Sequence, residues 1–90
     1  MEVILNNLKY YLEKDDSGCF DKSLVEDKIT EYFIPYDYIL GDFSYGRVRY
    51  KGFYKSDNKK ASKINDIKYL ENYIENFCSY GCKWFLLKKM

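Results

Sequence analysis

Two short runs rich in Tyr, Ile, Val and Phe, at residues 37–43 and 47–54, are separated by the spacer Ser44-Tyr45-Gly46. Side chains of these types fit the pleated, half-buried surface of a sheet, and a short spacer that contains glycine suits a tight loop. The pair therefore predicts a β hairpin. This hairpin is the strongest local constraint on what the chain can fold into.

Two further regions predict strands. Residues 3–5 and 9–14 flank Asn6-Asn7, a pair that tolerates the left-handed backbone of a tight turn, so they predict a second hairpin. Residues 83–89 contain the run Trp84-Phe85-Leu86-Leu87, which predicts a last strand buried on both faces over its middle. Trp84 and Phe85 should lie on opposite faces of that strand. The pattern leaves its place in the sheet open.

Two other segments repeat apolar residues with the period of a helix. The first begins at Ser23, a candidate N-cap with a glutamate three residues later as in a capping box, and it ends at Pro35. Its apolar face comprises Val25, Ile29, Tyr32 and Phe33. The second begins at Asn65 or Asp66 and stops at Gly81. Its apolar face comprises Ile67, Leu70, Ile74, Phe77 and Cys78.

The predicted elements follow the order β-β-α-β-β-α-β. This order indicates an α+β fold, in which a mostly antiparallel sheet of about five strands packs with two helices. Of the 90 residues, 47% are apolar and 20% are aromatic, which is too apolar for a disordered chain and calls for a packed core. No linker or repeat divides the chain, so we expect residues 1–90 to form a single domain.

The sequence also indicates the cellular compartment in which we expect the protein. No apolar run approaches the ~20 residues that a membrane helix needs, and the first residues lack the basic start and long apolar stretch of a signal peptide. The cysteines, Cys19, Cys78 and Cys82, are odd in number, which fits reduced thiols. We therefore expect a cytoplasmic protein without a membrane partner.

The chain has no histidine, which removes the commonest general base and the histidine-bearing metal sites. Cys78 and Cys82 are four residues apart and are compatible with a disulfide or half of a zinc site. A structural zinc site usually has four strong ligands, however, and three cysteines supply three. The simpler interpretation places Cys78 in the core on a helix and Cys82 at the start of a strand. We expect no metal and no cofactor.

Two carboxylates are candidates for chemistry. Asp37 and Asp42 differ by five positions, so they point to opposite faces of a regular strand, which argues against a paired acid–base site. Asp42 follows Gly41 in the block of residues 41–46 and is expected at the hairpin tip. There it could bind a cation or a base edge, or bond the backbone two residues on. A metal-assisted phosphate-ester hydrolase at Asp42 is the remaining enzyme hypothesis, and we expect a non-enzymatic protein.

The net charge of +1 conceals a division of charge. Residues 1–45 hold four basic and ten acidic side chains, whereas residues 46–90 hold eleven and four. Residues 47–63 alone carry seven basic side chains against Asp57. Such a segment favours a partner that carries negative charge.

The spacing within this segment predicts a basic strip on one strand face. Residues two apart share a face, so Arg47, Arg49, Lys51 and Lys55 should point one way, with Phe53 among them. Cations meet the phosphates of a nucleic acid, and an aromatic ring stacks on an unpaired base. The same pattern also keeps an ordinary sheet face solvated and discourages edge pairing.

Three blocks of sequence resemble the YutD-like family: YDYILGDFSYG at residues 36–46, RYKGFY at 49–54 and FCSYGCKWFLL at 77–87. The resemblance extends from about Tyr10 onward. Phe43 stands where the family often has tryptophan, Tyr50 where it often has leucine, and Arg47 where a neutral polar residue can stand. The resemblance implies a small cytosolic protein of low-GC Gram-positive bacteria or their wall-less relatives. It implies no activity and no site residue, because the family is uncharacterised.

Two functions are compatible with these patterns. The first is an accessory protein that binds RNA or another polyanion through Arg47, Arg49, Lys51, Phe53, Lys55, Lys59, Lys60, Lys63 and Tyr45. The alternative is a protein–protein interaction module, in which exposed aromatic side chains act as anchors and the two oppositely charged halves engage complementary patches.

Overall fold

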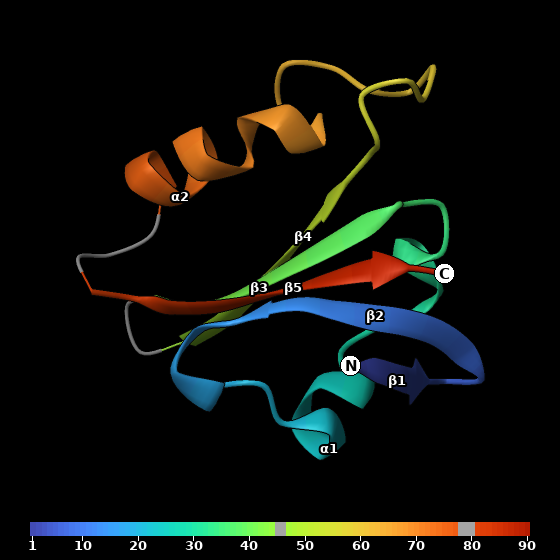
Figure 1. The fold of residues 1–90 in the computed structure, drawn as a ribbon, viewed down its shortest axis with the longest axis vertical. Coiled ribbons are helices and arrows are strands. Elements are labelled where there is room, and N and C mark those ends of the chain that lie inside the picture. Colours follow the sequence, from blue (N-terminus) through green and yellow to red (C-terminus); the bar gives the residue numbers. More distant parts are fainter. Residues whose placement is uncertain (45–46, 78–80) are drawn as a thin grey trace.

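In the computed structural model, five strands form one antiparallel sheet in the order β1-β2-β5-β3-β4 (Figure 1). The strands are β1 (Glu2–Leu5), β2 (Leu8–Asp15), β3 (Tyr38–Ser44), β4 (Arg47–Phe53) and β5 (Lys83–Lys89). The helices are α1 (Lys22–Glu26) and α2 (Leu70–Phe77). The structure describes residues 1–44, 47–77 and 81–90. The predicted α+β fold and its element order are confirmed.

Strand β5 lies at the centre of the sheet, between the hairpins β1–β2 and β3–β4. Its middle residues Phe85, Leu86 and Leu87 are all buried. Because side chains alternate between faces, such a strand needs cover on both sides, and only a central position supplies it. The prediction of a doubly buried last strand is confirmed, and the structure adds its position.

The two helices lie on opposite faces of the sheet and make three layers (Figure 1). On the α1 face, the buried core comprises Val3, Leu5, Tyr10, Val25, Ile29, Phe33, Ile39, Phe85 and Leu87. On the α2 face, a smaller core comprises Leu40, Phe53 and Leu86, with half-buried side chains of α2 packed over it. Among the described residues, no helix has the length and apolar content to cross a membrane.

The start of the first helix differs from the prediction. Asp21 is the N-cap, because its carboxylate accepts hydrogen bonds from the backbone N–H groups of Ser23 and Leu24. A hydrogen bond from the Ser23 hydroxyl and the Leu24 N–H bond together lower the pKa of Asp21. Ser23 therefore supports the cap instead of being the cap, since the charged carboxylate of an aspartate two positions earlier is a strong acceptor for the first N–H groups of the helix.

The first helix is also shorter than predicted, because the first hairpin takes its carbonyl groups. The side-chain amide of Asn6 donates to the carbonyls of Glu26 and Ile29, at 3.1 and 2.6 Å, so these acceptors do not continue the helix. A separate 3₁₀ turn, η2 (Glu31–Phe33), completes the segment. Val25, Ile29 and Phe33 are buried as predicted, whereas Tyr32 is exposed.

The second helix begins as the 3₁₀ turn η3 (Ile67–Tyr69) and continues as α2. Asp66 is its N-cap and accepts a hydrogen bond from the Lys68 N–H at 3.0 Å. Three of the predicted apolar residues pack on the core of the α2 face, namely Ile67, Leu70 and Ile74. Phe77 does not, because it lies at the end of α2 and its ring stacks on Tyr73 with 56% of the side chain exposed. Cys78 lies outside the described residues.

Candidate interaction surface at the edge of the sheet

The predicted basic strip lies on one face of β4 except for Lys55, which follows the strand, and α2 covers much of that face. The Arg49 guanidinium donates to the carbonyl of Phe77 at the end of α2, at 2.6 Å. The Lys51 ammonium lies 5.4 Å from the centre of the Tyr73 ring on α2, and the Phe53 ring lies 5.8 Å from the same ring. The spacing in the sequence therefore identified which side chains share a face of β4, but it could not show that α2 packs over that face.

Arg49 is engaged within the fold. Its Nε lies 2.9 Å from Oδ1 of Asp42, whose side chain is 1% exposed. Asp42 sits in the middle of β3, directly opposite Arg49 in the register of the hairpin. The expectation of Asp42 at the hairpin tip is thus wrong, because β3 continues two residues further, to Ser44. The carboxylate neutralises a cation of the predicted strip.

Gly41 serves packing in the same strand. A Cβ at this position would lie 2.2 Å from Cζ of Phe85, whose ring is fully buried in the central strand. The glycine is therefore needed for the close approach of the ring.

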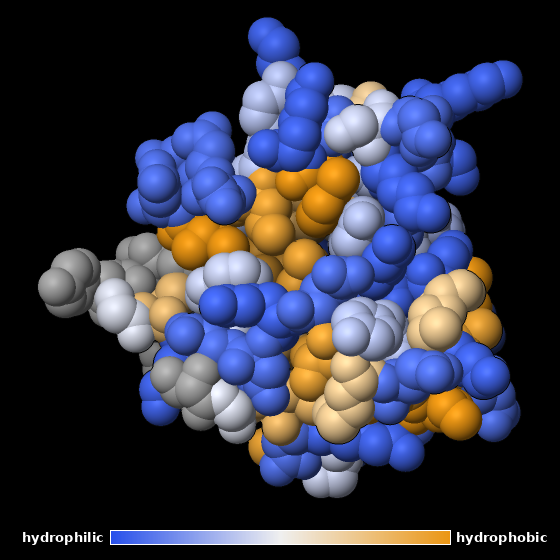
Figure 2. Space-filling view, viewed as in Figure 1, coloured by the Kyte–Doolittle hydropathy of each residue, from blue (hydrophilic) through white to orange (hydrophobic). Residues whose placement is uncertain are grey.

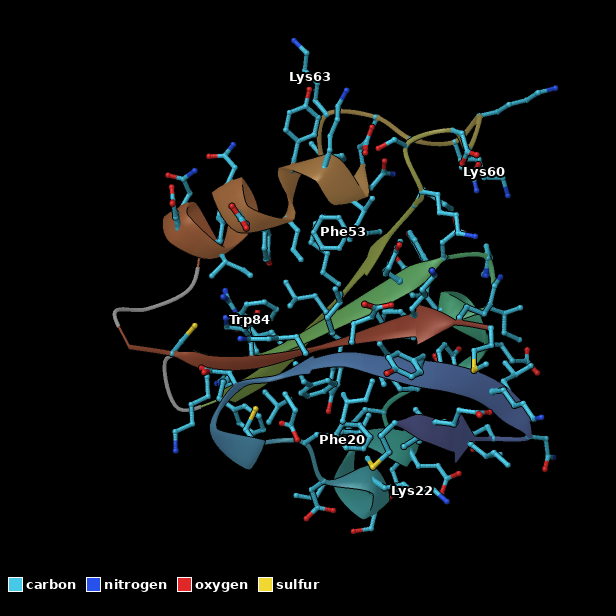
Figure 3. All side chains as sticks on the ribbon, in the orientation of Figure 1. Phe20, Lys22, Phe53, Lys60, Lys63 and Trp84 are labelled. Atoms are coloured by element: carbon cyan, nitrogen blue, oxygen red, sulfur yellow. The ribbon has the colours of Figure 1, made fainter. Side chains whose placement is uncertain are left out.

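Two aromatic rings were candidates for stacking on bases, Phe53 and Tyr45. Phe53 is 1% exposed, and its side chain lies between α2 and the sheet (Figure 3). A buried ring offers no surface on which a base can stack, so Phe53 is not a candidate for stacking on a base. Tyr45 lies outside the described residues.

The remaining cations lie on β4 or in the segment between β4 and η3. Lys51 is half-buried, whereas the other members are exposed: Arg47, Lys55, Lys59, Lys60 and Lys63. Lys60 and Lys63 belong to the segment between β4 and η3 and extend away from Phe53 (Figure 3). The structure thus keeps accessible cations on β4 and in the segment after it, which we call the rim, although Arg49 is paired within the fold.

Asp37 fixes the start of the lysine-rich segment. Its carboxylate accepts hydrogen bonds from the Lys55 N–H and the Asn58 amide, at 2.8 and 3.1 Å. Partial burial acts to raise the pKa of Asp37, but these hydrogen bonds outweigh it and hold the pKa below its usual value. Asp37 and Asp42 therefore hold different partners and do not form a paired site. In the described part of the chain, no cluster of three Cys, Asp or Glu side chains is placed to bind a metal ion.

Strand β4 is an edge strand, and its outer backbone is covered at one residue. The Tyr54 N–H donates to the Asn65 carbonyl at 2.6 Å, and the Tyr54 carbonyl accepts from the Ile67 N–H at 2.9 Å. Backbone groups alternate in direction along a strand, so every second residue before Tyr54 also points outward. These residues are Val48, which is exposed, Tyr50, which is half-buried, and Gly52, which is buried. Beyond the ladder with β3, no backbone hydrogen bond among the described residues involves them.

Two hollows meet at this open edge. The first, of about 350 Å³, is lined by Tyr32, Tyr36, Tyr50, Lys51, Gly52, Ile64, Asn65 and Tyr73. The second, of about 330 Å³, is lined by Lys51, Phe53, Lys63, Ile64, Tyr69, Asn72, Tyr73 and Phe77. Lys51, Ile64 and Tyr73 line both. The first hollow contains side chains from both faces of the sheet, so it lies across the edge itself.

Tyrosines form one wall of the first hollow. Tyr36 stacks on Tyr54 with ring centres 4.7 Å apart, and its hydroxyl lies 3.3 Å from that of Tyr32. The hydrogen bond with Tyr32, together with partial burial, raises the pKa of Tyr36 to about 12. The wall needs Gly52, because a Cβ there would come within 2.2 Å of the Tyr36 ring.

Exposed apolar side chains border the hollows. Val48 is 40% exposed, Phe77 56% and Ile64 74%. The sequence patterns did not single out Ile64, an isolated apolar residue between Lys63 and Asn65. We call the set of Val48, Tyr50, Lys51, Ile64, Tyr73 and Phe77 the β4 surface. Figure 2 shows the opposite side of α2, where a second apolar strip lies between the helix and the sheet.

Comparisons with known proteins agree with this fold. Residues 4–88 match the model of the YutD-like family, described as "Putative antitoxin YutD-like". The chain is 32% identical over 88 residues to "Putative antitoxin YutD" of Bacillus subtilis strain 168, in an alignment that covers 98% of this chain and 97% of the relative. The solution NMR structure of YutD from B. subtilis has a TM-score of 0.82 and 31% identity, and the match covers all of this chain and 82% of the other. The chain belongs to the YutD-like family.

Proposed function

We propose that this protein is a protein-binding module whose partner docks on the β4 surface. The observation that carries the proposal is the coincidence of an open strand edge, two hollows and three exposed apolar side chains in one place. Contiguous apolar surface rimmed by polar residues is typical of a protein–protein interface. The word antitoxin in the family description supports the same class of function, because an antitoxin counteracts a toxin.

The charge of the surface specifies the partner's chemistry. The rim carries Arg47, Lys51, Lys55, Lys59, Lys60 and Lys63, and Asp57 is the acidic residue among them. Complementary charge steers association and rejects wrong partners. The partner therefore has an acidic surface around an apolar centre.

The test uses variants of the exposed apolar residues. Tagged protein captures partners from extracts of its own cells after nuclease treatment, and the captured protein is then produced alone and with this chain. Ile64→Lys with Phe77→Lys should weaken binding about 100-fold, because each change places a charge in the apolar centre. Leu24→Lys, on the opposite face and 64% exposed, is the matched control and should bind like the wild type.

The proposal also predicts a biological readout. The captured protein should slow growth when it is produced alone and should not do so when wild-type chain is present. Retention of the same partner by the Ile64→Lys, Phe77→Lys variant, or toxicity that the wild-type chain leaves unchanged, would contradict the proposal.

RNA binding is the second candidate, and the exposed lysines of the segment after β4 favour it. Lys59 and Lys60 are exposed, and neither takes part in an ion pair within the described part of the chain. A gel-shift series with pooled cellular RNA at increasing salt should then show steep salt dependence, and Lys59→Glu with Lys60→Glu should abolish the shift. Capture that disappears on nuclease treatment would favour this function over the first.

A further inference from the structure

We infer that the partner binds as a sixth strand: an extended acidic segment pairs with the open backbone edge of β4 and places alternate side chains in the two hollows. This inference rests on the proposed function and names the mode of binding. It follows from the backbone of β4 and from the position of the hollows.

The backbone edge supplies the hydrogen bonds. The outward N–H and carbonyl groups of Val48 and Tyr50 form a row with the spacing of a strand, whereas Gly52 is buried and residues 65–67 already use the same edge at Tyr54 in a parallel bridge. An extended peptide beside β4 would pair with the groups of Val48 and Tyr50. Strand addition of this kind draws affinity from main-chain bonds and specificity from side-chain pockets.

The hollows suit the side chains of an added strand. Successive side chains of a strand point to opposite faces of the sheet. Tyr32 and Tyr36 bound the space on the α1 face of the edge, whereas Phe77 and Tyr69 bound it on the α2 face. An added strand would therefore place one set of side chains against tyrosines and the alternate set against the end of α2.

Charge decides between a second copy of this chain and a different partner. If two copies paired antiparallel about a two-fold axis at Arg49, Arg47 would lie opposite Lys51 of the second copy. Like charges directly opposite each other in a sheet are destabilising. Arg47, Lys51 and Lys63 line or border the edge, so an acidic segment is the complementary occupant.

The first test measures where a defined probe binds. The probe is a synthetic peptide of about eight alternating glutamates and valines with blocked ends, which is long enough to match a typical strand. Amide hydrogen exchange of the full chain should slow at Val48 and Tyr50 and should stay unchanged in β1, the opposite edge. A lysine–valine peptide is the charge-reversed control and should give no protection.

The second test removes one outward donor. Val48→Pro deletes the N–H that faces solvent, a change that edge strands tolerate, whereas Val48→Thr keeps the N–H and the branched side chain. Loss of one main-chain hydrogen bond should weaken peptide binding about tenfold for Val48→Pro and leave Val48→Thr unchanged. Unchanged hydrogen exchange in the α1 face core would show that both variants are folded.

The outcomes separate this inference from the proposed function. Equal peptide affinity for Val48→Pro and wild type, equal binding of the lysine–valine peptide, or protection outside β4 would overturn strand addition. Partner capture that is lost with Ile64→Lys and Phe77→Lys but kept with Val48→Pro would overturn the inference and leave the docking surface in place. Capture that neither set of changes affects would overturn both.

Discussion

The ion pair of Asp42 and Arg49 shows how single residues set the accessible charge of this protein. Asp42 is buried in β3, and Arg49 spans from that carboxylate to the carbonyl at the end of α2. The guanidinium thus satisfies a buried acceptor and a helix C-terminus together, with planar geometry that a lysine cannot reproduce. Arg49, a residue of the predicted strip, therefore links β3 to the end of α2.

This arrangement predicts strong coupling between the two side chains. Arg49→Met keeps much of the aliphatic stem and removes the charge, so it leaves the Asp42 carboxylate buried without its cation. We expect a loss of about 2 kcal/mol in the free energy of unfolding, measured by urea denaturation, with Arg49 one-third exposed and therefore partly screened. In a double-mutant cycle, Asp42→Asn should couple to Arg49→Met by about 1 kcal/mol. Additive single effects would show that the pair does not act together.

At the scale of elements, the first hairpin and α1 are coupled through the turn residue Asn6. Asn6 and Asn7 both have positive φ, at 51° and 67°, as the asparagine pair predicts. The Asn6 side chain also donates to two carbonyls in and after α1. The backbone N–H of Asn6 donates to the Glu26 carboxylate at 3.0 Å. The turn therefore determines where the helix ends.

Glycine substitutions separate these two roles. Asn6→Gly keeps the positive φ and removes the two side-chain bonds, so it should lower the free energy of unfolding by about 1–2 kcal/mol. Asn7→Gly is the matched control at the neighbouring positive φ and should change stability by less than about 0.5 kcal/mol. Thermal unfolding followed by circular dichroism measures both. Equal effects at the two positions would assign the role of Asn6 to backbone conformation alone.

The elements also divide by position in the sheet. The doubly buried β5 is the last strand in sequence, and it pairs with both hairpins. The two hairpins are therefore joined into one sheet only when β5 is in place between them. β4, in contrast, lies at an edge with its outer backbone open. The same antiparallel pairing thus gives one strand a role in the core and another a role at the surface.

At the scale of the whole molecule, acidic side chains couple stability to pH. A hydrogen bond from the Ser56 hydroxyl and one from the Lys68 N–H lower the pKa of Asp66, and hydrogen bonds likewise lower the pKa of Asp37 against the effect of burial. A carboxyl with a lowered pKa binds fewer protons in the folded state than in the unfolded chain. Its contribution is complete above the unfolded pKa of about 3.9 and is lost as the pH falls through the lower folded value.

Stability should therefore be nearly constant from pH 7 to about 5 and should fall below about 4. Asp66→Asn should make this acid-side slope shallower, because one of the linked carboxyls is gone. Asp57→Asn, at an exposed site in the same segment, is the control. The midpoint of thermal unfolding across a pH series measures the slope. An unchanged slope in Asp66→Asn would contradict the assignment.

The sequence by itself determined the element order, the two hairpins and the period of the buried faces. These follow from local rules: asparagine pairs adopt left-handed backbone, alternation fixes a strand face, and Asp66 caps a helix. The residues of the basic strip that share a face were also fixed by alternation alone. Local rules could not fix the end of α1, because the competing bonds come from Asn6, twenty residues earlier.

The tertiary structure alone decided which faces are covered and which edge is open. Phe53 is buried and Arg49 is held by a helix carbonyl because α2 packs over β4, and Ile64 and Phe77 are left outside because they lie beyond that cover. Periodicity gives the direction of a side chain relative to its own backbone. Whether another element lies in that direction depends on long-range packing, which no local pattern encodes.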